Sequence, residues 1–260
     1  MTGRIAENLA RIEDRICAAA HRAGRDRAEI TLVAVSKTHS AEAIREAYEA
    51  GVRHFGENRV QEWEGKRGSV MSLPDAVWHL IGHLQSNKAG RAANLFHSVD
   101  SVDDLHLIEK LQRARDEIST EPDAGNAANE SVEDANLPAK LHTKSHEKLR
   151  VLLEVRVAEE ETKSGTHAAE LPALAQRVIA AENLHFAGLM CIPPFFEDAE
   201  RARPYFAKVR EVREALQQQL ARPLPVLSMG MSHDFAVAIA EGATEIRVGT
   251  AIFGARESTK

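Results

Sequence analysis

The stretch TLVAVSKTHSAEAIREAYEAGVRHFGEN, residues 31–58, contains one complete strand–helix–strand unit. An apolar run, 31–36, predicts a buried strand. The segment from Ser40 to Gly51 has the cap and terminal glycine that are typical of an amphipathic helix, and a second short strand is predicted at 53–57. Two strands joined by a helix are normally parallel in one sheet. The fold therefore depends on how often this unit recurs.

The same unit recurs along the rest of the chain. Eight short apolar runs are predicted as strands, at 31–36, 53–57, 77–82, 95–99, 151–157, 185–192, 225–230 and 245–249. Amphipathic segments separate them, so strands alternate with helices. Eight such units, in about 250 residues, can close into a (β/α)8 TIM barrel, and we predict this α/β fold. A doubly wound open sheet is the alternative that the alternation also permits.

Two segments lie outside this repeat. Residues 1–24 carry charges throughout and have the pattern of an amphipathic helix rather than of a secretion signal, so we expect an extra N-terminal helix. Residues 116–138 contain seven acidic side chains, no Lys or Arg and almost no large apolar residues, a composition that cannot repay the entropy of ordering. We predict a single domain, residues 1–260, with a disordered, mobile acidic insertion at 116–138 between helix 4 and strand 5 of the barrel. A partner-docking arm is the alternative role for the insertion.

The composition argues against several classes of function. The net charge is −6, and the rest of the chain carries about +1 without the acidic insertion, so a basic stripe for nucleic acid is not expected. No run approaches the roughly 18 apolar residues that a membrane span requires. Cys17 and Cys191 form no disulfide framework and lack the close Cys/His spacing of a zinc site. We therefore expect a cytoplasmic protein with no membrane, nucleic-acid or metal partner.

A lysine follows the first strand. In a parallel barrel the C-terminal ends of the strands meet at one rim, where barrel enzymes place their sites. Lys37 is predicted at this rim, directly after the run 31–36. One interpretation is a side chain that extends into solvent. The other is an amine kept reactive in a partly apolar pocket, where it forms a Schiff base with a substrate carbonyl or with the aldehyde of pyridoxal phosphate.

The last two predicted strands are followed by small residues. SMGMS, 228–232, and VGTAIFG, 248–254, allow backbone N–H groups to approach an anion, and their Ser and Thr hydroxyls add donors. TIM barrels often bind phosphate in the loops after strands seven and eight. Together with Lys37, these loops suggest that the ligand is a phosphorylated aldehyde.

Five stretches carry a resemblance to a known family: AVSKTHSAEAIREAYEAGVRHFGENRVQE, WHLIGHLQSNK, HSVDS, GLMCIPP and LSMGMSHDFAVAIAEGATEIRVGTAIFGAR. Together they resemble the pyridoxal phosphate homeostasis protein family, over nearly the whole chain apart from the acidic insertion. The resemblance implies the fold of the barrel domain of alanine racemase. It also implies a protein that binds pyridoxal 5'-phosphate (PLP), has little or no established catalysis, and keeps this reactive aldehyde available but controlled, with apo PLP enzymes as candidate recipients.

The resemblance also implies the residues of the site. Lys37 of VSKT would form the internal aldimine with PLP. Arg247 would face the pyridine nitrogen. The phosphate would be cradled by Ser228, Gly249 and Thr250, with Gly230 and Ser232 nearby, and the walls of the site would include Asn58 and His79. The alternatives are a turn or cap residue for Asn58 and a satisfied core histidine for His79.

One stretch departs from the family pattern. In RVAEEETKSG, 156–165, Arg156 and Ala158 stand where the family usually has an asparagine and a serine, whereas Glu160, Lys163 and Gly165 match. We expect Arg156 either to pair with a neighbouring carboxylate or to change the polar wall of the pocket.

A carrier is favoured over an enzyme by two features. A two-base racemase needs a second acid/base, which in alanine racemase is a tyrosine from another domain, and here Tyr48 and Tyr205 lie in predicted helices while the sequence stops soon after strand eight. A permanently charged Arg247 beside the ring nitrogen would oppose its protonation and weaken PLP as an electron sink. We expect a monomeric PLP carrier. A weak racemase or decarboxylase that uses the same lysine, and a cofactor-free Schiff-base aldolase, are the alternatives.

Overall fold

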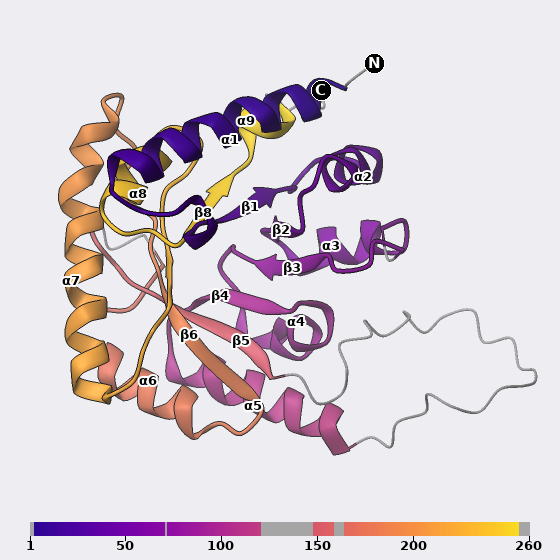
Figure 1. Cartoon of the computed structure of the whole chain (residues 1–260). Helices are drawn as coiled ribbons and strands as arrows, with labels where there is room; N and C mark the ends of the chain where they lie inside the picture. The colour runs from indigo at the N-terminus through magenta and orange to yellow at the C-terminus, as the bar shows by residue number, and fades with distance from the viewer. Residues whose placement is uncertain (1–2, 71, 121–147, 159–163, 255–260) are drawn as a thin grey trace, which may run out of the picture.

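The computed structural model describes residues 3–70, 72–120, 148–158 and 164–254. Its parallel strands pair in chain order and the last pairs with the first, which closes a barrel (Figure 1). The strands are β1 (Thr31–Val35), β2 (His54–Glu57), β3 (Val77–Leu80), β4 (Ser98–Val102), β5 (Leu149–Glu154), β6 (Leu184–Met190), β7 (Val226–Ser228) and β8 (Glu245–Val248). The predicted TIM barrel is confirmed, and the open-sheet alternative is wrong.

Helices follow the strands and cover the outside of the barrel (Figure 1). They are α2 (Ala41–Glu49), α3 (Val60–Arg67), α4 (Ala89–Leu95), α5 (Leu105–Thr120), α6 (Leu171–Ala180), α7 (Arg203–Leu220), α8 (Phe235–Ala240) and α9 (Thr250–Phe253), with short 3-10 turns η1 (Arg27–Glu29), η2 (Ser86–Lys88) and η3 (Ala199–Ala202). Ser40 caps α2 as predicted, because its side chain accepts a hydrogen bond from Ala43 N–H. Of the helices in these described ranges, none is both long and apolar enough to cross a membrane.

The predicted N-terminal helix is confirmed as α1 (Arg4–Arg22). Ile5, Leu9, Ile12 and Ile16 are buried, and their spacing of three to four residues puts them on one face. This face packs against α2, α8 and α9 (Figure 1). Because α9 has only four residues, α1 covers the part of the barrel that a full-length eighth helix would cover.

The fourth strand begins later than the sequence predicts. The prediction was 95–99, but β4 is Ser98–Val102, because Leu95 is the last residue of α4 and Phe96 is its C-cap. Asp100 and Ser101 therefore lie within the strand rather than after it, and both are fully buried.

The predicted acidic insertion, 116–138, overlaps the end of α5, which continues to Thr120. Asp116 Oδ1 accepts a hydrogen bond from Asn183 Nδ2 at 2.8 Å, and Ser119 Oγ donates to Arg115 O at 2.7 Å. These bonds stabilise the last turn, so 116–120 belong to the helix. The remainder of the predicted insertion, 121–138, lies outside the described residues.

An aromatic cluster joins the barrel to its outer helices. Trp63 of α3 packs on Trp78 of β3 with ring centroids 4.0 Å apart, and Phe55 of β2 stacks on Trp78 at 5.0 Å. Trp63 Nε1 donates to Leu95 O at 3.1 Å, so the indole N–H is satisfied although the residue is buried. This packing fixes the β2–α3 and β3–α4 units, which contain the loops that follow β2 and β3.

Candidate functional site

Lys37 lies just past the C-terminal end of β1. The strand ends at Val35, Ser36 is fully buried, and Lys37 is half-buried. Thr38 has a φ of +64°, so the chain turns sharply before α2 begins. Lys37 therefore stays at the rim formed by the C-terminal ends of the strands and the loops that follow them, which we call the barrel mouth.

Gly249 brings the turn after β8 next to the end of β1, two residues before Lys37. Ala34 of β1 pairs with Val248 of β8, so the chain leaves both strands side by side. A Cβ on Gly249 would lie 3.2 Å from Val35 Cβ and 3.3 Å from Val35 O, closer than side chains normally pack. The missing side chain therefore allows the turn after β8 to lie against the end of β1.

The turns after β7 and β8 are bonded to each other. Arg247 N–H donates to Gly230 O at 3.0 Å, and Gly249 N–H contacts Ser232 Oγ at 3.3 Å. Gly230 has a φ of +92°, which favours glycine at this turn. The structure thus brings together the residues predicted to cradle phosphate, which are Ser228, Gly230, Ser232, Gly249 and Thr250.

Arg247 is fixed at the mouth between the ends of β6 and β7. Its side chain is nearly fully buried, Nη1 donates to Ser228 Oγ at 2.8 Å, and Nη2 donates to Cys191 O at 2.8 Å. Burial raises the pKa of the Cys191 thiol to about 12. Cys191 is therefore neutral at physiological pH and unsuited to act as a nucleophile.

Asn58 lies on the β2–β3 side of the mouth. It is half-buried and lines a cavity of about 670 Å³ between the loops after β2 and β3, together with Arg59, His83 and Lys88 among others. A Cβ on Gly82 would lie 2.4 Å from Asn58 O, so the two loops are in tight contact. Asn58 is thus both a packed loop residue and part of a polar cavity wall.

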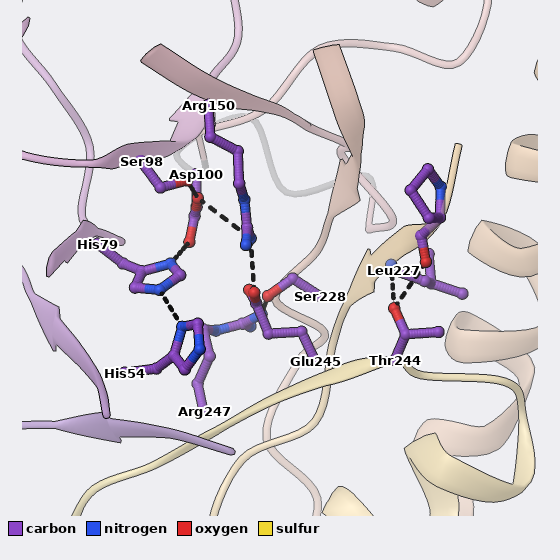
Figure 2. Close-up of polar contacts among 11 residues, drawn as sticks. His54, His79, Ser98, Asp100, Arg150, Leu227, Ser228, Thr244, Glu245 and Arg247 are labelled. Atoms are coloured by element: carbon purple, nitrogen blue, oxygen red, sulfur yellow. Dashed lines mark hydrogen bonds and ion pairs between the residues drawn. The ribbon is translucent and has the colours of Figure 1, made fainter. Parts of the chain in front are cut away.

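His79 lies inside the barrel, below the mouth loops. It is fully buried in β3, its Nδ1 is 3.0 Å from Asp100 Oδ2, and its Nε2 is 3.0 Å from His54 Nδ1 (Figure 2). Both ring nitrogens therefore have protein partners. These surroundings match the alternative in which His79 is a satisfied core histidine.

Arg150 and Glu245 extend this network. Arg150 Nη2 is 2.5 Å from Glu245 Oε2 and 3.8 Å from Asp100 Oδ1 (Figure 2). His54 and Glu245 are the first residues of β2 and β8, so the network lies toward the N-terminal ends of the strands. We call these five residues, His54, His79, Asp100, Arg150 and Glu245, the floor cluster.

The charges of the floor cluster compensate one another. Burial alone would raise the pKa of Asp100, but His79 and Arg150 outweigh it and lower that pKa to about 2. Burial, assisted by His79, lowers the pKa of His54 to about 4. Ligand atoms of His79, Asp100 and Glu245 lie within 4.8 Å of one another, as in a metal site. Arg150 pairs with both carboxylates, however, so the positive charge that they need is already present.

The stretch that departs from the family pattern makes a backbone contact. Arg156 Nε donates to Gly165 O at 3.1 Å, which is a backbone carbonyl. Arg156 and Ala158 both line a second cavity, of about 280 Å³. Glu160 and Lys163 lie outside the described residues.

Sequence reasoning missed Arg150 and Glu245. A signal existed, because Glu245 and Arg247 are two residues apart in one predicted strand and so place two charges on one face. That pattern indicates a polar barrel interior. The partner Arg150 comes from β5, and no local pattern connects it to β8.

Comparisons with known proteins place this chain among its relatives. It matches the family model of the alanine racemase N-terminal domain over residues 7–257. The pyridoxal phosphate homeostasis protein of Pseudomonas aeruginosa is 44% identical over 255 residues, which cover 97% of this chain and 96% of that protein. The protein of the same description from Escherichia coli K12 is 39% identical over 260 residues, 98% of both chains.

Solved structures give the same relationship. PipY of Synechococcus elongatus, solved with PLP bound, is 38% identical with a TM-score of 0.76, covering 96% of this chain and all of that one. Alanine racemase of Corynebacterium glutamicum is 17% identical with a TM-score of 0.61, covering 96% of this chain and 59% of that one, which shows a shared fold. The resemblance noted in the sequence is confirmed, and the chain belongs to the pyridoxal phosphate homeostasis protein family.

Proposed function

We propose that this protein binds PLP reversibly at the barrel mouth and takes part in intracellular PLP homeostasis. The observation that carries the proposal is that the Gly249 turn after β8 packs against Val35 at the end of β1, two residues before Lys37. A lysine and an anion-binding turn on neighbouring strands suit an aldehyde that bears a phosphate. The relatives named for PLP homeostasis and the PLP-bound PipY support this assignment.

Each proposed site residue has one role. Lys37 supplies the amine that bonds to the aldehyde carbon of the cofactor as an aldimine, with the carbonyl oxygen leaving as water. The turns after β7 and β8 hold the phosphate through backbone N–H groups and hydroxyls. The missing side chain of Gly249 lets the turn after β8 lie against the end of β1. The phosphate-binding residues are Ser228, Gly230, Ser232, Gly249 and Thr250. Asn58 forms a wall on the β2–β3 side, and His79 supports the site from within the barrel.

Arg247 favours a carrier over an enzyme. When bound, the cofactor supplies an aldehyde that captures amines and a ring that withdraws electrons once its nitrogen is protonated. The guanidinium of Arg247 is held by Ser228 Oγ and Cys191 O, and its positive charge would oppose that protonation. We propose that the protein stores PLP on Lys37 and releases it to free amines or to apo PLP enzymes.

The enzyme alternative is a weak amino-acid racemase or decarboxylase that uses Lys37. Such a racemase needs a second acid/base, and Tyr48 is committed elsewhere, because its hydroxyl donates to Pro74 O at 2.5 Å ahead of β3, at the end of the barrel opposite the mouth. Chiral analysis of amino acids incubated with the PLP-loaded protein tests this alternative. The carrier proposal predicts no steady racemisation or decarboxylation.

Titration of the apo-protein with PLP tests the proposed function. We expect a visible absorbance band of the lysine–PLP imine that Lys37→Ala abolishes, and activation of an added apo PLP enzyme by the loaded protein. An unchanged band in Lys37→Ala would contradict the role of Lys37. We also propose a monomer in the cytoplasm, in line with the free thiols of Cys17 and Cys191; size-exclusion chromatography with light scattering checks the monomer.

A further inference from the structure

The residues on both sides of Lys37 are held by side chains of the next β/α unit. Ser36 Oγ donates to Glu57 Oε1 at 2.6 Å, and Ser36 O accepts from Lys66 Nζ at 2.9 Å. On the other side, Thr38 N–H donates to Glu62 Oε1. Both neighbours of Lys37 are thus bonded to residues of β2 and α3, 21 to 30 positions later in the chain.

Lys66 connects these bonds into one cluster. Its Nζ lies 2.8 Å from Glu57 Oε1 and 3.2 Å from Glu62 Oε1. Glu62 and Lys66 are four residues apart in α3 and so share one helix face. The side chain of Glu57 is fully buried and that of Lys66 is 13% exposed. A single ammonium group therefore links the two carboxylates and the Ser36 carbonyl beneath Lys37.

The cluster contains two carboxylates but a single ammonium group. Glu57 Oε2 has no hydrogen-bond partner among the described residues. Burial raises the pKa of Glu57, and the neighbouring Lys66 opposes this rise. The ionised form of Glu57 therefore depends on Lys66. A fully buried carboxylate with one unbonded oxygen adds little to stability. We therefore expect Glu57 to contribute by holding its partners, Ser36 and Lys66, in place.

The backbone at Thr38, next to Lys37, has a conformation that needs to be held in place. A threonine with positive φ is strained, and such strain persists only where surrounding bonds over-determine the conformation. The bond from Thr38 N–H to Glu62 supplies that restraint. We infer that Lys66, together with Glu57 and Glu62, positions Lys37 for bonding to PLP by fixing the backbone on both sides of it. This inference rests on the proposed function of Lys37.

The test compares Lys66→Met, Lys66→Met with Glu57→Gln, and Lys110→Met, a control on the exposed surface of α5. The measurements are apo-protein stability in urea, PLP affinity, and the extent to which borohydride fixes PLP on Lys37. We expect Lys66→Met to lower stability and to weaken PLP binding about tenfold, because Ser36 O loses a charged donor. The control should match the parent in all three measurements.

The double variant separates positioning from a purely structural role. Glu57→Gln removes the need for a cation, so we expect the double variant to regain most of the stability lost in Lys66→Met. PLP affinity should stay about tenfold below the parent, because Ser36 O still lacks its donor. Recovery of affinity together with stability, or parent-like affinity in Lys66→Met, would overturn the inference.

Glu62→Ala keeps the inference testable if Lys66→Met does not fold. The Glu62 side chain is 28% exposed, so its loss should leave stability close to the parent. We expect about threefold weaker PLP binding, because Thr38 N–H loses its acceptor; unchanged binding contradicts the inference. A failure of the proposed function is recognised separately, since borohydride would then leave Lys37 of the parent protein unlabelled.

Discussion

The floor cluster and the barrel mouth both place charged groups inside the barrel, but they hold them in different ways. In the floor cluster, side chains from different strands bond to one another, as His79 does with Asp100 and Arg150 with Glu245. At the mouth, the turns after β7 and β8 contribute backbone groups and small side chains. Charge inside a TIM barrel therefore does not by itself mark a ligand site. The end of the strands at which it lies is the better guide.

This difference predicts opposite effects of substitution. Changes in the floor cluster, His79 excepted, should lower the free energy of unfolding and leave PLP affinity unchanged in the folded protein. Changes at the mouth should lower PLP affinity, whether or not they also lower stability.

Arg150→Met should have the largest effect on stability. It leaves Asp100 and Glu245 buried without their shared cation, so we expect the free energy of unfolding to fall by about 3–5 kcal/mol. Urea unfolding measures this loss, and PLP titration at a temperature where the variant is folded should give the parent affinity. Arg113→Met, which breaks an exposed pair with Glu117, should leave stability near the parent. A large loss of PLP affinity in folded Arg150→Met would remove the distinction between floor and mouth.

Gly230→Ala should have the largest effect on PLP binding outside Lys37. At a φ of +92°, the new Cβ would lie 2.6 Å from Ala238 Cβ and 2.9 Å from Phe235 Cα, so the turn after β7 must shift. We expect about tenfold or weaker PLP binding and a stability loss of about 1–3 kcal/mol. Gly65→Ala in α3 is the control, because its Cβ meets nothing within 4 Å. Parent-like PLP affinity in Gly230→Ala would argue against phosphate binding at this turn.

The same contrast shows what the sequence could predict. The eight strands and the N-terminal helix follow from local periodicity, and the mouth residues follow from their positions after the strands. The start of β4 could not be predicted in this way, because Leu95 and Phe96 have the pattern of the beginning of a strand although they end α4. The surroundings of His79 could not be predicted either, because its partners come from β2 and β4 and pairing between strands leaves no local pattern.

The pH dependence of stability should report on two half-buried histidines in or near the floor cluster. Burial lowers the pKa values of His54 and His97 to about 4 from an ordinary value of 6.5. Between these values the unfolded chain binds protons that the folded protein does not, so the free energy of unfolding should fall as the pH falls from 6.5 towards 4 and should level off above 6.5. Urea unfolding at several pH values measures this slope. His97→Gln should flatten it, and an equally steep slope in that variant would refute the assignment.

Thr244→Val should have the smallest effect. Thr244 Oγ1 accepts from Leu227 N–H at 2.8 Å and donates to Pro225 O at 3.0 Å, which ties the start of β8 to β7 (Figure 2). Loss of these bonds should cost about 1 kcal/mol of stability. PLP affinity should stay at the parent value, because the contact lies at the end of these strands opposite the mouth. Weaker PLP binding in this variant would show that the two ends of the barrel are coupled.

The central claim is that the amine of Lys37 holds PLP at the barrel mouth. Borohydride reduction of the PLP-loaded protein, followed by peptide mass analysis, identifies the lysine that bears the cofactor. The account predicts a reduced PLP adduct on the peptide that contains Lys37 and no fixed cofactor in Lys37→Ala. An adduct on another lysine of the parent, or PLP binding by Lys37→Ala at the parent affinity, would contradict it.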